Sequence, residues 1–127
     1  MNEIFSQSVE NLALKIKNSE LTSVELCEKY IERIYEFEKE VKAWAFFDKK
    51  ILLEKAKEAD DYRRSGKPIG FLHGIPVAVK DIVGTVEMPT ECGTSIRKGK
   101  SYSQNAESID LLISEGAIVM GKTATSE

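Results

Sequence analysis

A chain of 127 residues, 42% hydrophobic and 31% charged, has the composition of one globular domain and not of a disordered segment. Its formal net charge is −3, and it has no basic run and no basic residues interleaved with aromatic ones, which argues against nucleic-acid binding. No apolar stretch reaches membrane-spanning length, and the first residues lack the basic-then-apolar order of a secretory signal. We therefore expect a cytoplasmic protein that binds neither nucleic acid nor a membrane.

The first part of the chain predicts two amphipathic helices. Residues 8–18 carry apolar side chains at helical spacing, namely Val9, Leu12 and Ile16. Residues 22–41 open with Thr22 and, three positions later, Glu25, which is the spacing of a capping box. An apolar stripe then follows along this second helix and is expected to face inward: Val24, Cys27, Ile31, Ile34 and Phe37.

The next segments predict a strand and a third helix. Residues 42–48 are aromatic and read as a strand or a strand-like link. Residues 48–66 predict a helix that Asp48 caps and Gly66 ends, with Leu52, Ala56 and Ala59 facing inward. Together with the two earlier helices, these residues make residues 1–66 a predicted helical arm.

Residues 67–127 predict the start of a mixed or parallel β-sheet. The run from Pro76 to Asp81 is short and apolar, as in a strand buried on both faces, and residues 84–100 predict a loop. Residues 105–116 predict a helix, and residues 117–121 predict a second buried strand. Ile109, Leu112 and Ile113 are expected to face inward from that helix. A strand, a helix and another strand form the unit of a parallel sheet, so the fold class is α/β, with helices flanking the sheet.

The few residues suited to metal or redox chemistry do not form a site. One histidine, His73, and two distant cysteines cannot make the usual zinc ligand sets, so we expect no metal and no cofactor. Cys27 falls on the apolar stripe of a helix and is expected in the core. Cys92 lies among turn residues, without a local histidine to support a nucleophile. For His73, on a loop before a strand, we expect hydrogen bonding or packing.

Two nucleotide-binding patterns are present only in part. Val77–Lys80 is similar to the strand that carries the ATP-binding lysine of protein kinases, but the glycine-rich loop, the His-Arg-Asp motif and the Asp-Phe-Gly motif are absent. Gly116–Thr123 satisfies the phosphate-loop spacing G-x-x-x-x-G-K-S/T. Its four intervening residues are apolar and strand-like, and a helix precedes the first glycine, so a phosphate-binding loop remains only a remote alternative.

A third pattern extends over nearly the whole chain. The segment Gly-Ile-Pro-Val-Ala-Val-Lys-Asp spans Gly74–Asp81, a Thr-x-x-Gly turn spans Thr90–Gly93, and Gly-Lys-Thr followed by a final Glu lies within Gly116–Glu127. In order and spacing these segments resemble the amidase signature family, and the helical segment Glu20–Leu26 is also similar. Thr94, Ala124 and Thr125 depart mildly from the family pattern, so the subgroup, whether amidase or part of an amidotransferase, stays open.

The resemblance implies cleavage of carboxamides through an acyl-enzyme, with a serine nucleophile, a second serine held by a cis peptide, and a lysine. By position, Lys80 is that catalytic lysine. A lysine in water has a pKa near ~10.4, so it must lose hydration before it can act as a base at neutral pH. Asp81 is expected to be a structural hydrogen-bonding group that points away from Lys80, and Lys122 is expected to be structural too.

The glycine- and serine-rich segment that carries the two serines of this family does not occur in the sequence. The serines after residue 94 lack that glycine setting: Ser95, Ser101, Ser103, Ser108, Ser114 and Ser126. We therefore expect the N-terminal part of an amidase that is inactive alone, acts on a small-molecule amide, and pairs with a missing C-terminal half or forms a homo-oligomer. The alternative is a non-catalytic fragment that acts as a binding or assembly partner.

Overall fold

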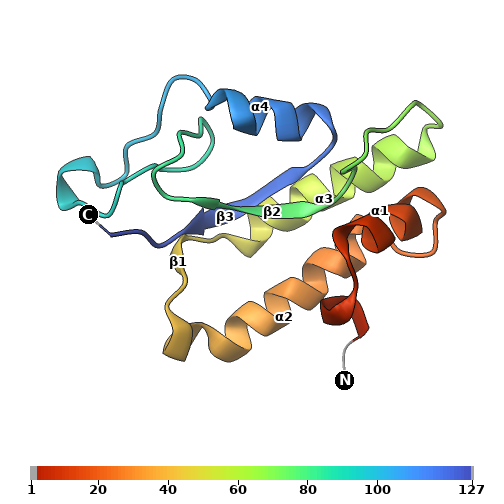
Figure 1. The fold of residues 1–127 in the computed structure, drawn as a ribbon, viewed down its shortest axis with the longest axis horizontal. Helices are drawn as coiled ribbons and strands as arrows, with labels where there is room; N and C mark the ends of the chain where they lie inside the picture. The colour runs from red at the N-terminus through yellow and green to blue at the C-terminus, as the bar shows by residue number, and fades with distance from the viewer. Residues whose placement is uncertain (1–2, 127) are drawn as a thin grey trace.

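A computed structural model describes residues 3–126 of the chain. Its helices are α1 (Val9–Lys17), α2 (Ser23–Val41), α3 (Lys49–Arg64) and α4 (Glu107–Ser114), and its strands are β1 (Trp44–Phe46), β2 (Pro76–Lys80) and β3 (Ile118–Thr123). In Figure 1, α4 and the loop before it lie above the strands, and α2 lies below them. No helix in this part of the chain is long and apolar enough to cross a lipid bilayer.

The helices begin and end where the local sequence predicts. Thr22 Oγ1 accepts a hydrogen bond from Glu25 N at 3.0 Å, and Glu25 Oε2 accepts one from Thr22 N at 2.8 Å, which confirms the capping box. Asp48 caps α3 by accepting from Lys50 N at 2.9 Å. Gly66, just after α3, has a φ of +79°, a left-handed conformation that suits a helix stop.

The strands form one sheet in the order β1-β3-β2. β2 and β3 run parallel with α4 between them in the chain, and β1 pairs antiparallel with β3. Both the predicted strand–helix–strand unit and the predicted strand in residues 42–48 are therefore confirmed. The fold is mixed α/β, and among the described strands β1 and β2 are the two edges.

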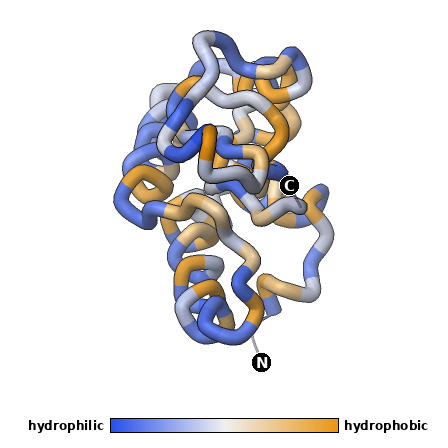
Figure 2. The backbone as a smooth tube through the Cα atoms, turned by 90° about the vertical axis from the view of Figure 1, so that its left-hand side faces the viewer, coloured by the Kyte–Doolittle hydropathy of each residue, from blue (hydrophilic) through white to orange (hydrophobic). Residues whose placement is uncertain are grey.

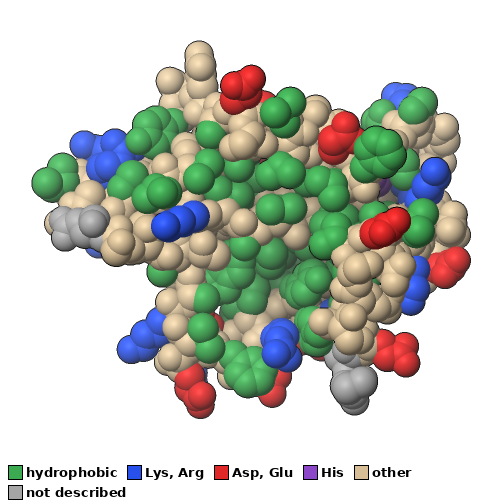
Figure 3. Space-filling model, viewed as in Figure 1, with side chains coloured by type: hydrophobic (Ala, Val, Ile, Leu, Met, Phe, Trp, Pro, Cys, Tyr) green, Lys and Arg blue, Asp and Glu red, His purple; other side chains and the backbone are tan. Residues whose placement is uncertain are grey.

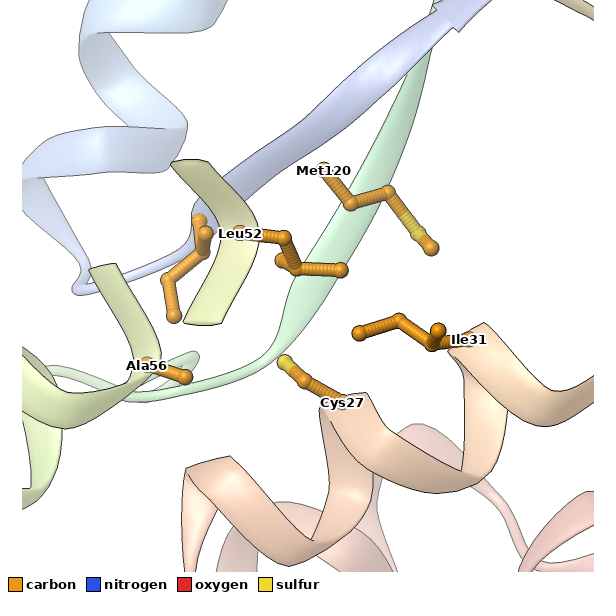
Figure 4. Packing of buried hydrophobic residues seen from close by; sticks show 6 residues of the cluster. Cys27, Ile31, Leu52, Ala56 and Met120 are labelled. Carbon is orange, nitrogen blue, oxygen red and sulfur yellow. The ribbon is translucent and has the colours of Figure 1, made fainter. Parts of the chain in front are cut away.

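The main hydrophobic core lies between α2, α3 and β3. Figure 4 shows its side chains pointing toward one another from these elements. Its buried members are Cys27, Ile31, Leu52, Ala56, Ile118 and Met120. A second cluster joins α1 and α2 to the segment before β2, through Leu12, Ile16, Leu26 and Ile75. In Figure 2 the helical segments change repeatedly between hydrophobic and hydrophilic colours, as expected for helices with one buried face.

Three residues expected to face inward are exposed instead: Val9 of α1, Phe37 of α2 and Ile113 of α4. Helical periodicity identifies an apolar face but does not show whether another element packs on it. Phe37 illustrates this, because its ring lies 4.9 Å from the Arg33 guanidinium on the helix surface and not in the core.

Candidate functional site

Lys80 is the last residue of β2, and its partner on β3 is Thr123. Successive residues of a strand point to opposite faces. Val79 is buried, whereas Ala78 and Lys80 are exposed, so the expectation that this strand is buried on both faces is wrong for this chain. Residues 3–126 cover only the Val79 face. Within them the Lys80 side chain has no hydrogen bond or ion pair, and it lacks the dry surroundings that the sequence led us to expect.

Asp81 points away from Lys80 and into the protein. Only 2% of its surface is exposed, and its carboxylate accepts from Glu91 N at 3.3 Å. The same carboxylate lies 3.5 Å from Lys122 Nζ. Its backbone N–H donates to Thr123 O at 3.0 Å. Asp81 therefore joins the end of β2 both to β3 and to the middle of the following loop.

Lys122 lies on β3 and is fully buried, with 0% of its surface exposed. Its Nζ donates to Thr90 Oγ1 at 2.7 Å, to Thr85 Oγ1 at 3.2 Å and to Pro89 O at 3.2 Å. An ammonium group has three donors, so these bonds satisfy it while Asp81 balances its charge. Burial lowers the pKa of Lys122, and the Asp81 carboxylate opposes part of that shift. We call these five residues the Lys122 cluster.

The loop around the Lys122 cluster is held by its own backbone. Thr90 N donates to Lys100 O at 2.8 Å, and Ala106 N donates to Gly84 O at 2.9 Å. Thr85 Oγ1 also donates to Met88 O at 2.9 Å. The predicted loop is thus an ordered cover over one face of β2 and β3, closed by hydrogen bonds at its middle and near its ends.

The contacts of Asp81 and Lys122 are those of structural residues, but sequence reasoning did not single out Thr85 and Thr90. A signal for them was present. A lysine within the apolar run 118–123 needs polar partners if it is buried, and these two threonines stand on either side of the Pro89 turn.

The phosphate-loop alternative does not fit the structure. Ile118–Thr123 forms β3 and not a pliable loop, and the lysine of the pattern is buried among protein groups. Its glycines are needed for close packing. A Cβ at Gly121 would lie 2.7 Å from Phe46 O, and one at Gly116 would lie 2.6 Å from His73 Cα. The spacing match therefore reflects how β3 packs against its neighbours.

The remaining residues considered for chemistry have structural surroundings. His73 is buried, and its Nε2 donates to Ala59 O at 2.7 Å, as expected for a hydrogen-bonding histidine. Cys27 is fully buried in the main core, and burial raises its pKa to about 12. Cys92 is half-buried and has a left-handed φ of 55° in the turn next to Gly93.

Comparison with known proteins gives the same family along most of the chain. The Amidase family model matches residues 25–127. One of the subunits of the glutamyl-tRNA(Gln) amidotransferase of Lachnospira eligens is 37% identical over 116 residues, which is 91% of this chain and 24% of the relative. The chain spans about a quarter of the length of the curated relatives that it matches.

Solved structures show the same fold. The peptide amidase of Stenotrophomonas maltophilia is 31% identical with a TM-score of 0.88, over 95% of this chain and 25% of the other. An amidase family protein from Bacillus anthracis is 33% identical with a TM-score of 0.86, over 98% of this chain and 25% of the other. With the motif on β2 and this fold, the chain belongs to the amidase signature family.

Proposed function

We propose that this chain is the lysine-bearing N-terminal part of a single amidase domain that hydrolyses a small-molecule carboxamide in the cytoplasm. The observation that carries the proposal is the position of Lys80 within the family motif Gly74–Asp81. It ends β2 on the open face of that strand, without a partner in residues 3–126. An amine presented in this way is free to meet a serine from residues outside this chain.

The proposed chemistry requires that other protein atoms cover Lys80. A neutral lysine amine can accept the proton of a bridging serine, which in turn accepts the proton of the nucleophilic serine. That amine is neutral near pH 7 only if its surroundings exclude water. The chain spans about a quarter of the length of its curated relatives, so a longer family member has enough additional sequence to provide this cover. Alone, the 127-residue chain is expected to be inactive.

The test is carboxamide hydrolysis by the longest protein encoded by the gene that carries this chain. Lys80→Ala should lower kcat/KM by roughly 10²–10⁴-fold, because it removes the general base. Lys57→Ala is the matched control: this exposed lysine of α3 has no described ion pair or hydrogen bond, and turnover should not change. Normal turnover by the Lys80→Ala protein would contradict the proposed role of Lys80.

A second candidate function, a non-catalytic assembly partner, is favoured by the open edge of β2 and by exposed apolar side chains such as Phe71, which is 88% exposed. The two functions differ in their response to Lys80→Ala. An assembly partner would bind its target equally well with and without this lysine, whereas an amidase would lose turnover while it kept its fold.

A further inference from the structure

We propose that Lys122 is a positioning residue for Lys80: it holds Asp81 on the buried face of the sheet, so that the Lys80 amine on the opposite face has no carboxylate partner. This inference rests on the proposed function. It concerns how the fold keeps a lysine available as a base although an aspartate follows it directly in the chain.

The first support is the register of the two strands. Val79 pairs with Lys122 and Lys80 pairs with Thr123. Side chains at paired positions of parallel strands lie on the same face, so Lys122 shares the buried face of Val79 while Lys80 lies on the other. The ammonium of Lys122 therefore pulls Asp81 to the side of the sheet that Lys80 does not occupy.

The second support is the set of contacts that holds Asp81. Its backbone N–H donates to Thr123 O at 3.0 Å, and its backbone carbonyl accepts from Cys92 N at 2.9 Å. Its carboxylate accepts from Glu91 N and lies 3.5 Å from Lys122 Nζ. Only the last contact brings a positive charge, so Lys122 supplies the charge that keeps an ionised Asp81 stable at 2% exposure.

The third support is electrostatic. A carboxylate within about 4–6 Å of a lysine stabilises its charged form, which would work against a base. The charged and titratable groups that face Lys122 are Asp81 and the Cys92 thiol; its other contacts are the hydroxyls of two threonines and the Pro89 carbonyl. Without Lys122, Asp81 would be a buried charge with no cation near it, and the exposed Lys80 amine would be the cation next to it in the chain.

The experiment uses the 127-residue chain and does not depend on hydrolysis. The lysine Cε and Nζ signals are followed by NMR during a pH titration, and the Lys80 signal is assigned from Lys80→Arg. In Lys122→Met, the Lys80 titration midpoint should rise by about 0.5–1 pH unit, because Asp81 becomes available to Lys80. In the double variant Lys122→Met/Asp81→Asn, the midpoint should return to that of the parent. Lys100→Met, which removes an exposed loop lysine, should leave it unchanged.

Asp81→Asn alone keeps the proposal testable if Lys122→Met does not fold. It retains Lys122 and should leave the Lys80 midpoint within about 0.2 pH unit of the parent, since the carboxylate is already directed elsewhere. A clear fall in Asp81→Asn would mean that Asp81 acts on Lys80 in the parent. Equal midpoints in folded Lys122→Met and in the parent would mean that Lys122 acts on stability alone. Either result would overturn the proposal, whereas a lack of hydrolysis in the longer protein would contradict only the proposed function.

Discussion

Buried ionisable side chains lie where separate parts of this chain meet. Lys122 and Asp81 connect the sheet to the loop that covers it, Asp60 connects α3 to the start of α2, and Cys27 lies in the core between α2 and α3. Each charged group has a partner, as burial requires. Cys27 is different because burial keeps it neutral, and this gives its proton a measurable effect on stability.

The Cys27 thiol should make stability fall at alkaline pH. Its pKa rises from 9.0 to about 12 on burial, so the folded state binds the proton more tightly than the unfolded state does. Its contribution is complete below pH 9 and is lost as the pH rises toward 12, by roughly 1 kcal/mol between pH 9 and pH 10. Urea unfolding of the parent and of Cys27→Ala at these two pH values measures it, since the difference between the two proteins should shrink by that amount.

Thiol labelling checks the same environment without unfolding. Because Cys92 is half-buried and Cys27 is fully buried, a thiol reagent should modify one cysteine in the folded protein and two in urea. Rapid labelling of Cys27 under native conditions would show that its pKa and burial are not as described. The lowered pKa of Lys122 acts in the opposite direction, raising stability as the pH approaches 10.5, but it is common to the parent and to Cys27→Ala and cancels in their difference.

At the scale of elements, the start of α2 is tied to distant parts of the chain. Asp60 of α3 accepts from Ser23 N at 2.7 Å and from Val24 N at 3.0 Å. Ser23 Oγ donates to Gly74 O at 2.6 Å, just before β2. A carboxylate at a helix N-terminus satisfies free N–H groups and interacts favourably with the helix dipole.

Removing the Asp60 carboxylate should therefore destabilise the joint between α2 and α3. Asp60→Ala is expected to lower the free energy of unfolding by about 2–4 kcal/mol, because two buried N–H groups lose charged acceptors. Asp60→Asn should lie between Asp60→Ala and the parent. Urea unfolding followed by circular dichroism measures both.

The neighbouring Asp61 provides the control. It is exposed and pairs with Arg64 at 2.9 Å on the helix surface, so Asp61→Ala should change stability by less than about 0.5 kcal/mol. Equal losses for Asp60→Ala and Asp61→Ala would mean that the buried contacts of Asp60 contribute no more than a surface pair.

Local elements of this fold could be predicted from sequence because their causes are local. The Thr22 capping box, the Asp48 cap and the Gly66 stop each act within a few residues. The contact between Asp60 and Ser23 could not, since it joins residues 37 positions apart and depends on how two helices pack. The exposed face of β2 was missed for a similar reason: an apolar run shows that a strand can be buried but not which residues cover it.

The candidate site divides in the same way. The motif identified Lys80 as the residue of interest, and strand alternation indicated that Asp81 would point away from it. The partners of Asp81 and Lys122 come from a loop whose path no period or cap predicts. The role of Lys80 stays a prediction, since it depends on groups beyond these 127 residues.

At the scale of the whole molecule, this chain exposes more apolar surface than its size requires. Figure 3 shows apolar side chains gathered across the middle of the face seen in Figure 1, in a hollow above α2. Phe71 and Ile96 are 88% and 80% exposed, and β2 presents an unpaired backbone edge next to Ala78. Contiguous apolar surface and a free strand edge both favour association with another protein surface.

The isolated chain should consequently self-associate as its concentration rises. Light scattering coupled to size-exclusion chromatography should show a mass above 14.2 kDa that grows with concentration from about 10 to 300 µM. Ala78→Lys places a charge on the exposed face of the edge strand and should shift the mass toward the monomer, because a charged edge resists strand pairing. Ser103→Lys adds the same charge to an exposed loop and should not.

The comparison between the two lysine variants separates edge pairing from simple charge repulsion. If both reduce the mass equally, added net charge and not the β2 edge controls association. A parent chain that stays monomeric at the highest concentration and melts cooperatively would instead mean that residues 3–126 form a self-sufficient domain. Its apolar face would then be a stable surface, and Lys80 would need no further protein to complete its surroundings.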